Sequence, residues 1–272
     1  MRLSVKHVTR YSFDTPARWL VQTHKLIPST CASQKVLSWK VNTGDAIRGA
    51  AFRDSAGDMV ETISVRGPVD ELVIEVTGEV ETLDLFGVLR DHRESVPPTT
   101  YLRSTRMIRP DVALRDLSVT ALDGMADDSA LNRAHALARA VNEAIEYVPG
   151  ETGEVTTAAE ALAGGRGVCQ DHAHALIAVA HAAEIPARYV AGYLHSGGDA
   201  MGEASHAWAE LFVPGLGWVG FDASNRCCPD ERYIRLCSGY DALDAAPIRG
   251  IMNAGVEEHL DVSVAVMSQH QQ

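Results

Sequence analysis

The spacing of apolar residues changes near residue 85, and this change limits the possible fold more than any other feature of the sequence. Before it, apolar side chains recur at every second position, as in Leu72, Ile74 and Val76. Turn-forming stretches such as DSAGD at 54–58 separate these runs. Such alternation is typical of strands with one buried face. Residues 1–90 are therefore expected to form an antiparallel β domain resembling a sandwich.

Helical spacing begins after a segment of mixed character. Apolar residues fall three or four positions apart over 131–148, on one face of a helix. A short helix is expected at 157–165, where Thr157 and Glu160 have capping-box spacing before two glycines. A third helix is predicted to run from Cys169 to about residue 184, just before an Ile-Pro pair.

Five stretches with strand character follow the third helix. The second and third are joined by PGLG, which is a strong hairpin signal. We expect these strands to form one antiparallel sheet, on which the helix that begins at Cys169 packs. Residues 91–272 are therefore predicted to be an α+β core, separate from the β domain. The five stretches are 187–194, 205–213, 218–224, 232–237 and 259–266.

Cys169 stands where the third helix is expected to begin. Backbone N–H groups there lack helical partners, and the helix dipole is positive, so a thiolate is stabilised. Glycines at 164, 165 and 167 allow another backbone to approach closely. A nucleophile is the leading interpretation; a buried structural thiol and a metal ligand are the alternatives.

His206 and Asp222 are the candidate base and its orienting partner, which a cysteine nucleophile requires. They lie on the two strands of the predicted hairpin. If Val213 pairs with Gly217, His206 and Asp222 share one face of the sheet. A shift of one residue puts them on opposite faces. A working site therefore predicts a hairpin loop of odd length.

The other polar and aromatic residues nearby have two interpretations each. Asp171, His172 and His174 suggest a metal site beside Cys169, but side chains two or three positions apart diverge around a helix. Their spacing matches no usual zinc pattern. We therefore predict no metal and no cofactor. Trp208 and Trp218 either shape an apolar tunnel near the thiol or are ordinary half-buried aromatics.

Composition limits the partners and the compartment. A net charge of −12 argues against nucleic acid, which requires a basic surface. No apolar run approaches the roughly 20 residues that span a bilayer, so no membrane segment is expected. Five scattered cysteines, an odd number, favour a reducing, cytoplasmic setting. The sequence does not determine the oligomeric state.

These residues resemble the bacterial transglutaminase-like family, whose core is related to papain-like cysteine proteases. The resemblance rests on GVCQDHAHALIAVAHAAEIPARYVAGYL around Cys169, on SHAWAELFVPGLGWVGFDASN around His206 and Asp222, and on the tail YIRLCSGYDALDAAPIRG. It implies that Cys169 is the nucleophile, His206 the base and acid, and Asp222 its orienting partner. Tyr233 departs from the family pattern, since a histidine is frequent at that position.

The resemblance also implies supporting roles and a reaction. Asp171 and His174 sit at characteristic positions and are expected to support the site structurally. The implied reaction is thiolate attack on a peptide or protein amide, with an oxyanion held by the backbone N–H of Cys169 and by an upstream donor, for which Tyr147 is the candidate. The thioester then passes to water or to an amine. The alternatives are a non-catalytic binding protein that keeps the fold and, third, a metal-dependent hydrolase.

Overall fold

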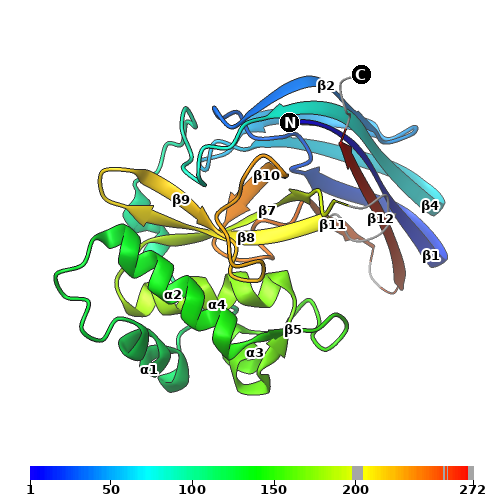
Figure 1. Ribbon diagram of the computed structural model, residues 1–272. Coiled ribbons are helices and arrows are strands. Elements are labelled where there is room, and N and C mark those ends of the chain that lie inside the picture. Colours follow the sequence, from blue (N-terminus) through cyan, green and yellow to red (C-terminus); the bar gives the residue numbers. More distant parts are fainter. Residues whose placement is uncertain (198–204, 254, 256, 269–272) are drawn as a thin grey trace.

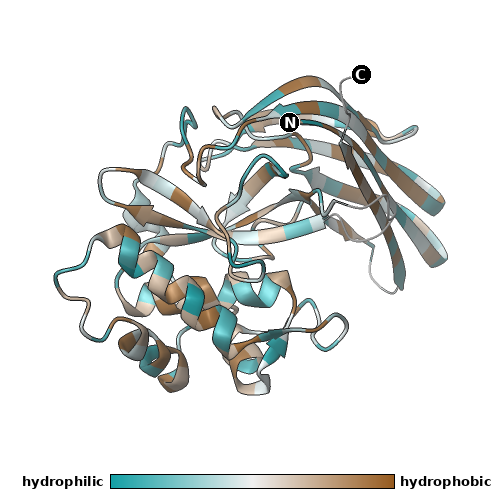
Figure 2. Ribbon diagram, viewed as in Figure 1, coloured by the Kyte–Doolittle hydropathy of each residue, from teal (hydrophilic) through white to brown (hydrophobic). Residues whose placement is uncertain are grey.

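The N-terminal region forms one long antiparallel sheet. The computed structural model describes residues 1–197, 205–253, 255 and 257–268. Among these, six strands pair in the order β11-β1-β4-β2, with β12 added to β1 and β3 to β4. Apolar and polar residues alternate in bands along the strands (Figure 2), which confirms the antiparallel β domain. Its strands form a single hydrogen-bonded sheet, whereas the expected sandwich would have two facing sheets. Their bounds are β1 Arg2–His24, β2 Gln34–Asn42, β3 Ile47–Arg53, β4 Met59–Thr82, β11 Ile248–Met252 and β12 Glu258–Ser268.

The last two strands return to this N-terminal sheet. A strand does form at 259–266, but it pairs with β1, from Leu3 opposite Ser268 to Phe13 opposite Glu258. The expectation that it completes the core sheet is therefore wrong. Alternation identifies a strand and its buried face, but it does not identify the strand's partner. Together β12 and β11 cover the edge of β1 that β4 leaves free.

The core contains a four-stranded antiparallel sheet in the order β10-β7-β8-β9. It lies between a layer of helices and the N-terminal sheet (Figure 1). Helix α4 packs directly on β7 and β8 and is surrounded by α1, α2 and α3, so its residues 171–180 are all buried. The predicted α+β core is confirmed. The bounds are η1 Pro98–Leu102, α1 Val112–Ala121, α2 Ala130–Ala144, β5 Glu146–Tyr147, α3 Ala158–Gly164, β6 Arg166–Gly167, α4 Cys169–Ala182, β7 Ala187–Leu194, β8 Ser205–Val213, β9 Gly217–Phe221 and β10 Tyr233–Gly239.

Side chains of the two sheets share one buried cluster. Leu3 and Val80 of the N-terminal sheet, with Val264 and Val266 of β12, belong to the same apolar cluster as Leu176 of α4. None of the helices in the described part of the chain has the length and apolarity needed to cross a bilayer.

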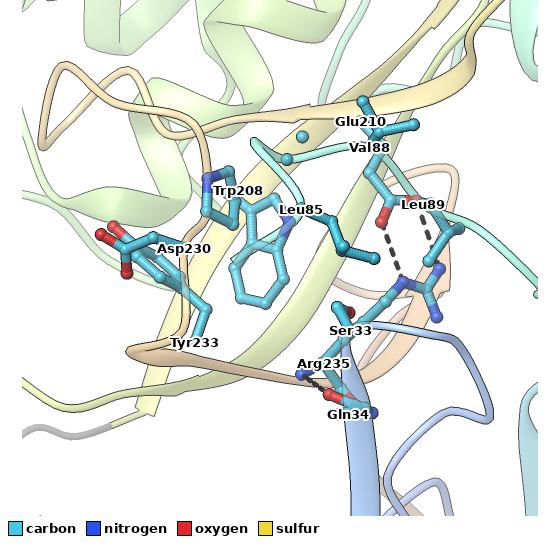
Figure 3. A pocket seen from close by; sticks show the side chains of 13 residues that line it. Ser33, Gln34, Leu85, Val88, Leu89, Trp208, Glu210, Asp230, Tyr233 and Arg235 are labelled. Carbon is cyan, nitrogen blue, oxygen red and sulfur yellow. Dashed lines mark hydrogen bonds and ion pairs between the residues drawn. The ribbon is translucent and has the colours of Figure 1, made fainter. Parts of the chain in front are cut away.

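Buried charges also join the N-terminal sheet to the core. Arg235 of β10 donates to Glu210 of β8 at 2.9 Å and to Asp58 at 3.1 Å. Its backbone N–H donates to Gln34 of β2 at 2.9 Å. Arg235, Gln34 and Glu210 line a cavity of about 40 Å³ beside Trp208 (Figure 3). Since each charge is hydrogen-bonded to a partner, the sheets are held in one relative position.

Candidate active site

Cys169 is the first residue of α4 and is partly exposed. The turn before it is fixed by Asp171, whose buried carboxylate accepts the N–H of Val168 at 2.8 Å and the hydroxyl of Thr152 at 2.6 Å. Gly167 makes this turn possible, because a Cβ there would lie 2.7 Å from the Asp171 Cβ. The thiol is therefore presented at a helix N-terminus whose turn is held by hydrogen bonds.

The β8–β9 hairpin brings His206 and Asp222 together. Val213 pairs with Gly217 and Phe212 with Trp218, so the loop has the predicted odd length of three residues. His206 and Asp222 share a face, and Nε2 of His206 lies 2.6 Å from Oδ2 of Asp222. The register prediction is confirmed.

Asp222 is surrounded by hydrogen-bond donors. Oδ1 accepts the hydroxyl of Ser224 at 2.6 Å, and Oδ2 accepts the side-chain amide of Asn225 and the phenol of Tyr233, each at 2.8 Å. Burial alone would raise the pKa of Asp222, but the bonds from His206, Ser224 and Asn225 outweigh it and hold the pKa well below its usual range. The carboxylate is therefore charged and fixed in orientation.

His206 carries the complementary charge. Burial alone would lower its pKa, but the hydrogen bonds with Asp222 and with Cys169 outweigh it and raise the pKa to about 9. The ring stacks on Trp208 with centroids 6.5 Å apart and meets the edge of Tyr233 at 5.8 Å. Because Nε2 is occupied by Asp222, Nδ1 is the nitrogen that remains for the thiol.

Cys169 and His206 open into the same cavity, of about 380 Å³. Its walls come from both parts of the fold. The core contributes the start of α4 and strands β7 and β8, while the N-terminal sheet contributes β1 and β12. A thiol and an imidazole thus meet at a cavity of the size that holds a small ligand or a peptide side chain, while the carboxylate of Asp222 holds the imidazole from outside the lining of this cavity.

Comparison with known proteins identifies the family. A model of the transglutaminase-like superfamily matches residues 119–223, which contain Cys169, His206 and Asp222. A model of the bacterial transglutaminase-like N-terminal region matches residues 3–81. An uncharacterized protein of Mycobacterium leprae is 32% identical over 286 residues, which cover 97% of this chain and 98% of that protein. The chain belongs to the transglutaminase-like superfamily.

Two further proteins extend this comparison. An uncharacterized protein of Mycobacterium tuberculosis is 39% identical over 132 residues, which cover 44% of this chain and 42% of that protein. The crystal structure of a candidate cysteine protease from Cytophaga hutchinsonii superposes with a TM-score of 0.73 at 20% identity, covering 100% of this chain and 92% of that one. At this identity the likeness concerns the fold, which agrees with the fold class expected from the sequence.

The two tryptophans of the β8–β9 hairpin lie at different distances from the transglutaminase-like site. Trp208 packs behind His206, but it is not among the described residues that line the cavity. Trp218 pairs with Phe212, six residues along β8 from His206, which is about 20 Å at the usual strand rise. Its ring lies against Arg188, with the guanidinium carbon 4.1 Å from the ring centroid. The interpretation of Trp218 as a cleft residue is therefore corrected.

His172 and His174 of α4 bond to different backbone groups and do not bond to one another. The ring nitrogens of His172 lie 2.9 Å from the carbonyl oxygens of Val168 and Ile145. Nε2 of His174 accepts the N–H of Ala242 at 3.0 Å, and burial lowers the pKa of His174 to about 4, so its ring is neutral. In the described part of the chain, no group of three or more potential metal ligands converges.

Tyr147, the candidate for the second oxyanion donor, is an exposed residue of β5. Its backbone pairs with Gly167, two residues before Cys169, and its ring centroid lies 6.2 Å from that of His172. It is not among the described residues that line the cavity. Its role as a donor stays a prediction.

Four residues at or beside the site were not identified from the sequence. Ser224 and Asn225 come shortly after Asp222 in the sequence. Asp222 accepts the hydroxyl of Ser224 and the backbone N–H of Asn225, and an Asp side chain commonly makes such bonds to the residues that follow it. That local signal was available. Tyr233 departs from the family pattern, and its bond to Asp222 depends on the pairing of β10 with β7. His7 reaches the cavity through packing between the two sheets, which no local pattern reveals.

Proposed function

We propose that this protein is a cysteine-dependent acyl-transfer enzyme that acts on the amide bonds of peptides or proteins. The observation that carries the proposal is the 2.6 Å contact between His206 and Asp222, on a ring whose other side faces the thiol of Cys169. This is the arrangement of nucleophile, base and orienting group that acyl transfer requires.

The reaction proceeds in two halves. The thiolate of Cys169 attacks the carbonyl carbon, and the developing oxyanion is stabilised by the unpaired N–H at the start of α4. The carbon–nitrogen bond then breaks, and the amine leaves with the proton of the His206 imidazolium. In the second half, neutral His206 takes a proton from water or from an incoming amine, which attacks the thioester and releases Cys169.

The test is a mass-spectrometric assay of peptide mixtures incubated with the protein and an added primary amine. Cleaved peptides indicate transfer to water, and amine adducts indicate transfer to the amine. We expect Cys169→Ala to reduce either product roughly a thousandfold or more. Cys228→Ser is the matched control, since this thiol is also partly exposed but lies outside the cavity. Undiminished turnover by Cys169→Ala would contradict the proposal. No product from the wild-type protein would favour a non-catalytic binding role.

A further inference from the structure

The N-terminal sheet forms one wall of the cavity that contains Cys169 and His206. His7, Thr9 and Tyr11 alternate along β1, so they share one face, and all three line the cavity. On the neighbouring strand, Leu260 lies opposite Tyr11 and Val262 opposite Thr9, and both line the same cavity. A substrate group that fills this cavity therefore contacts this sheet.

The wall presents no charge to a substrate. No Asp, Glu, Lys or Arg is among the described residues that line the cavity. Its polar side chains satisfy one another, because the two ring nitrogens of His7 lie 2.8 Å from the hydroxyl of Tyr193 and 2.8 Å from that of Thr9. Burial lowers the pKa of His7 to about 4, so the ring is neutral near pH 7. A charged group placed inside this cavity would lose its hydration and find no charged partner among the described lining residues. Glu154 and Glu258 line an adjoining cavity that shares Tyr11 and Leu260.

An apolar row on β12 continues from the buried core into the cavity. Leu260, Val262, Val264 and Val266 lie on one face of the strand. The last two are buried against the core, while Leu260 is 48% exposed and Val262 46% exposed. The core does not cover this end of the row, and the cavity lies there. Two large aliphatic side chains are thus left exposed in the cavity that contains the nucleophile, where an apolar ligand group would remove them from water.

We propose that the N-terminal sheet selects amide substrates that carry a bulky apolar side chain next to the reactive carbonyl, and that Leu260 and Val262 contact this side chain. The proposal rests on the function proposed above, because it places the carbonyl at Cys169. Hydrophobic pockets of this kind typically discriminate between side chains by roughly ten- to a hundredfold. The sheet is then a specificity element in addition to a packing partner of the core.

The test measures covalent labelling of Cys169 by acetyl-aminoacyl fluoromethyl ketones that carry leucine, phenylalanine, glycine, lysine or aspartate side chains. In each case the thiolate displaces fluoride and forms a thioether, so intact mass reports the rate. We expect the leucine and phenylalanine probes to react at least about tenfold faster than the other three. Equal rates for all probes would overturn the proposed specificity but leave the nucleophile intact. No labelling of Cys169 by any probe would overturn both proposals.

Substitutions on β12 connect this preference to the sheet. Leu260→Glu should lower the labelling rate of the leucine probe by about tenfold. It should also raise the rate of the lysine probe relative to that of the leucine probe. The fold should be preserved, because the Leu260 side chain is half exposed. Met267→Glu is the matched control: Met267 lies on the same strand, is 50% exposed, and does not line the cavity. Thermal unfolding of both variants checks that they are folded. A Leu260→Glu protein with the wild-type order of probe rates would contradict a role for this wall.

Discussion

Asp222 is a buried carboxylate that stays charged because four side chains bond to it. His206, Ser224, Asn225 and Tyr233 each lie within 2.8 Å of one of its oxygens. A buried carboxylate without such donors would take up a proton, and it would then no longer stabilise an imidazolium. The charge on His206, and hence its ability to protonate a leaving amine, depends on this set of donors.

This dependence predicts a pH profile for amide turnover. The wild-type value of kcat/KM should fall as pH rises through about 9, because the raised pKa of His206 marks the loss of the proton given to the amine. Asp222→Asn removes the main group that raises this pKa, and leaves burial, which lowers it, and the weaker raising effect of Cys169. The pH at which turnover falls on the alkaline side should therefore move below the wild-type value, and kcat at pH 7 should fall at least about a hundredfold.

The control is Asp230→Asn, which removes a carboxylate that pairs with Arg232 outside the site. In this variant kcat/KM should still fall as pH rises through about 9. An Asp222→Asn protein that is folded and loses turnover at the same alkaline pH as the wild-type protein would show that this loss belongs to another group.

These residues differ in how far the sequence could predict them. Cys169, His206 and Asp222 were predictable because a helix start and a short hairpin fix their positions locally. The sequence left two interpretations of Trp218 open, because hairpin register determines only the face on which a residue lies. It does not determine how far along that face the residue is from the site. His7 meets Tyr193 across 186 residues of sequence, and no periodicity in either segment specifies that contact.

At the scale of elements, the junction between α3 and α4 is built to present the thiol. Glycines stand on both sides of the turn, but their surroundings differ. A Cβ on Gly164 would meet nothing within 4 Å, whereas a Cβ on Gly167 would lie 2.7 Å from the Cβ of Asp171. Asp171 holds the start of α4 through its bond from Val168, so a shift of Asp171 also shifts Cys169.

This contrast predicts opposite effects for two similar substitutions. Gly167→Ala should lower the free energy of unfolding by about 1–3 kcal/mol, because a close-packed turn must move. It should also lower kcat by up to about a hundredfold through misplacement of the thiol. Gly164→Ala should leave kcat unchanged and raise stability by about 0.5–1 kcal/mol, since it replaces a helical glycine in open space. Urea denaturation and turnover assays measure both. Equal effects would contradict a specific role for Gly167.

Elements with local signals were predicted well, and their partners were not. The capping box at Thr157 forms as expected, and β7 and β8 have their predicted limits. Helix α1 was not predicted within the mixed segment, although Asp111 caps it by accepting the N–H of Leu114 at 2.9 Å. For β12 the strand was predicted but its place in the N-terminal sheet was not. It pairs with an edge of β1, and that edge is available only once the N-terminal sheet has formed.

At the scale of the whole molecule, the cavity exists only when the two sheets are held together. Much of that attachment is polar, and it centres on Asp58, a fully buried residue between β3 and β4. Its carboxylate accepts from Arg235 at 3.1 Å, from the hydroxyl of Ser29 at 3.0 Å and from the backbone N–H of Ser238 at 2.7 Å. It therefore joins the N-terminal sheet to β10 of the core.

Removal of this carboxylate should destabilise the molecule strongly. Asp58→Ala leaves the buried guanidinium of Arg235 with one partner fewer, and loss of one member of a buried ion pair costs about 3–5 kcal/mol. Glu71→Ala is the control, because Glu71 pairs with Arg10 at the exposed surface, where such pairs contribute about 0–1 kcal/mol. Urea denaturation followed by far-UV circular dichroism measures both. Because the sheets share one apolar cluster, the wild-type protein should unfold in a single transition. If Asp58→Ala unfolds at the wild-type midpoint, these charges do not hold the cavity walls in place.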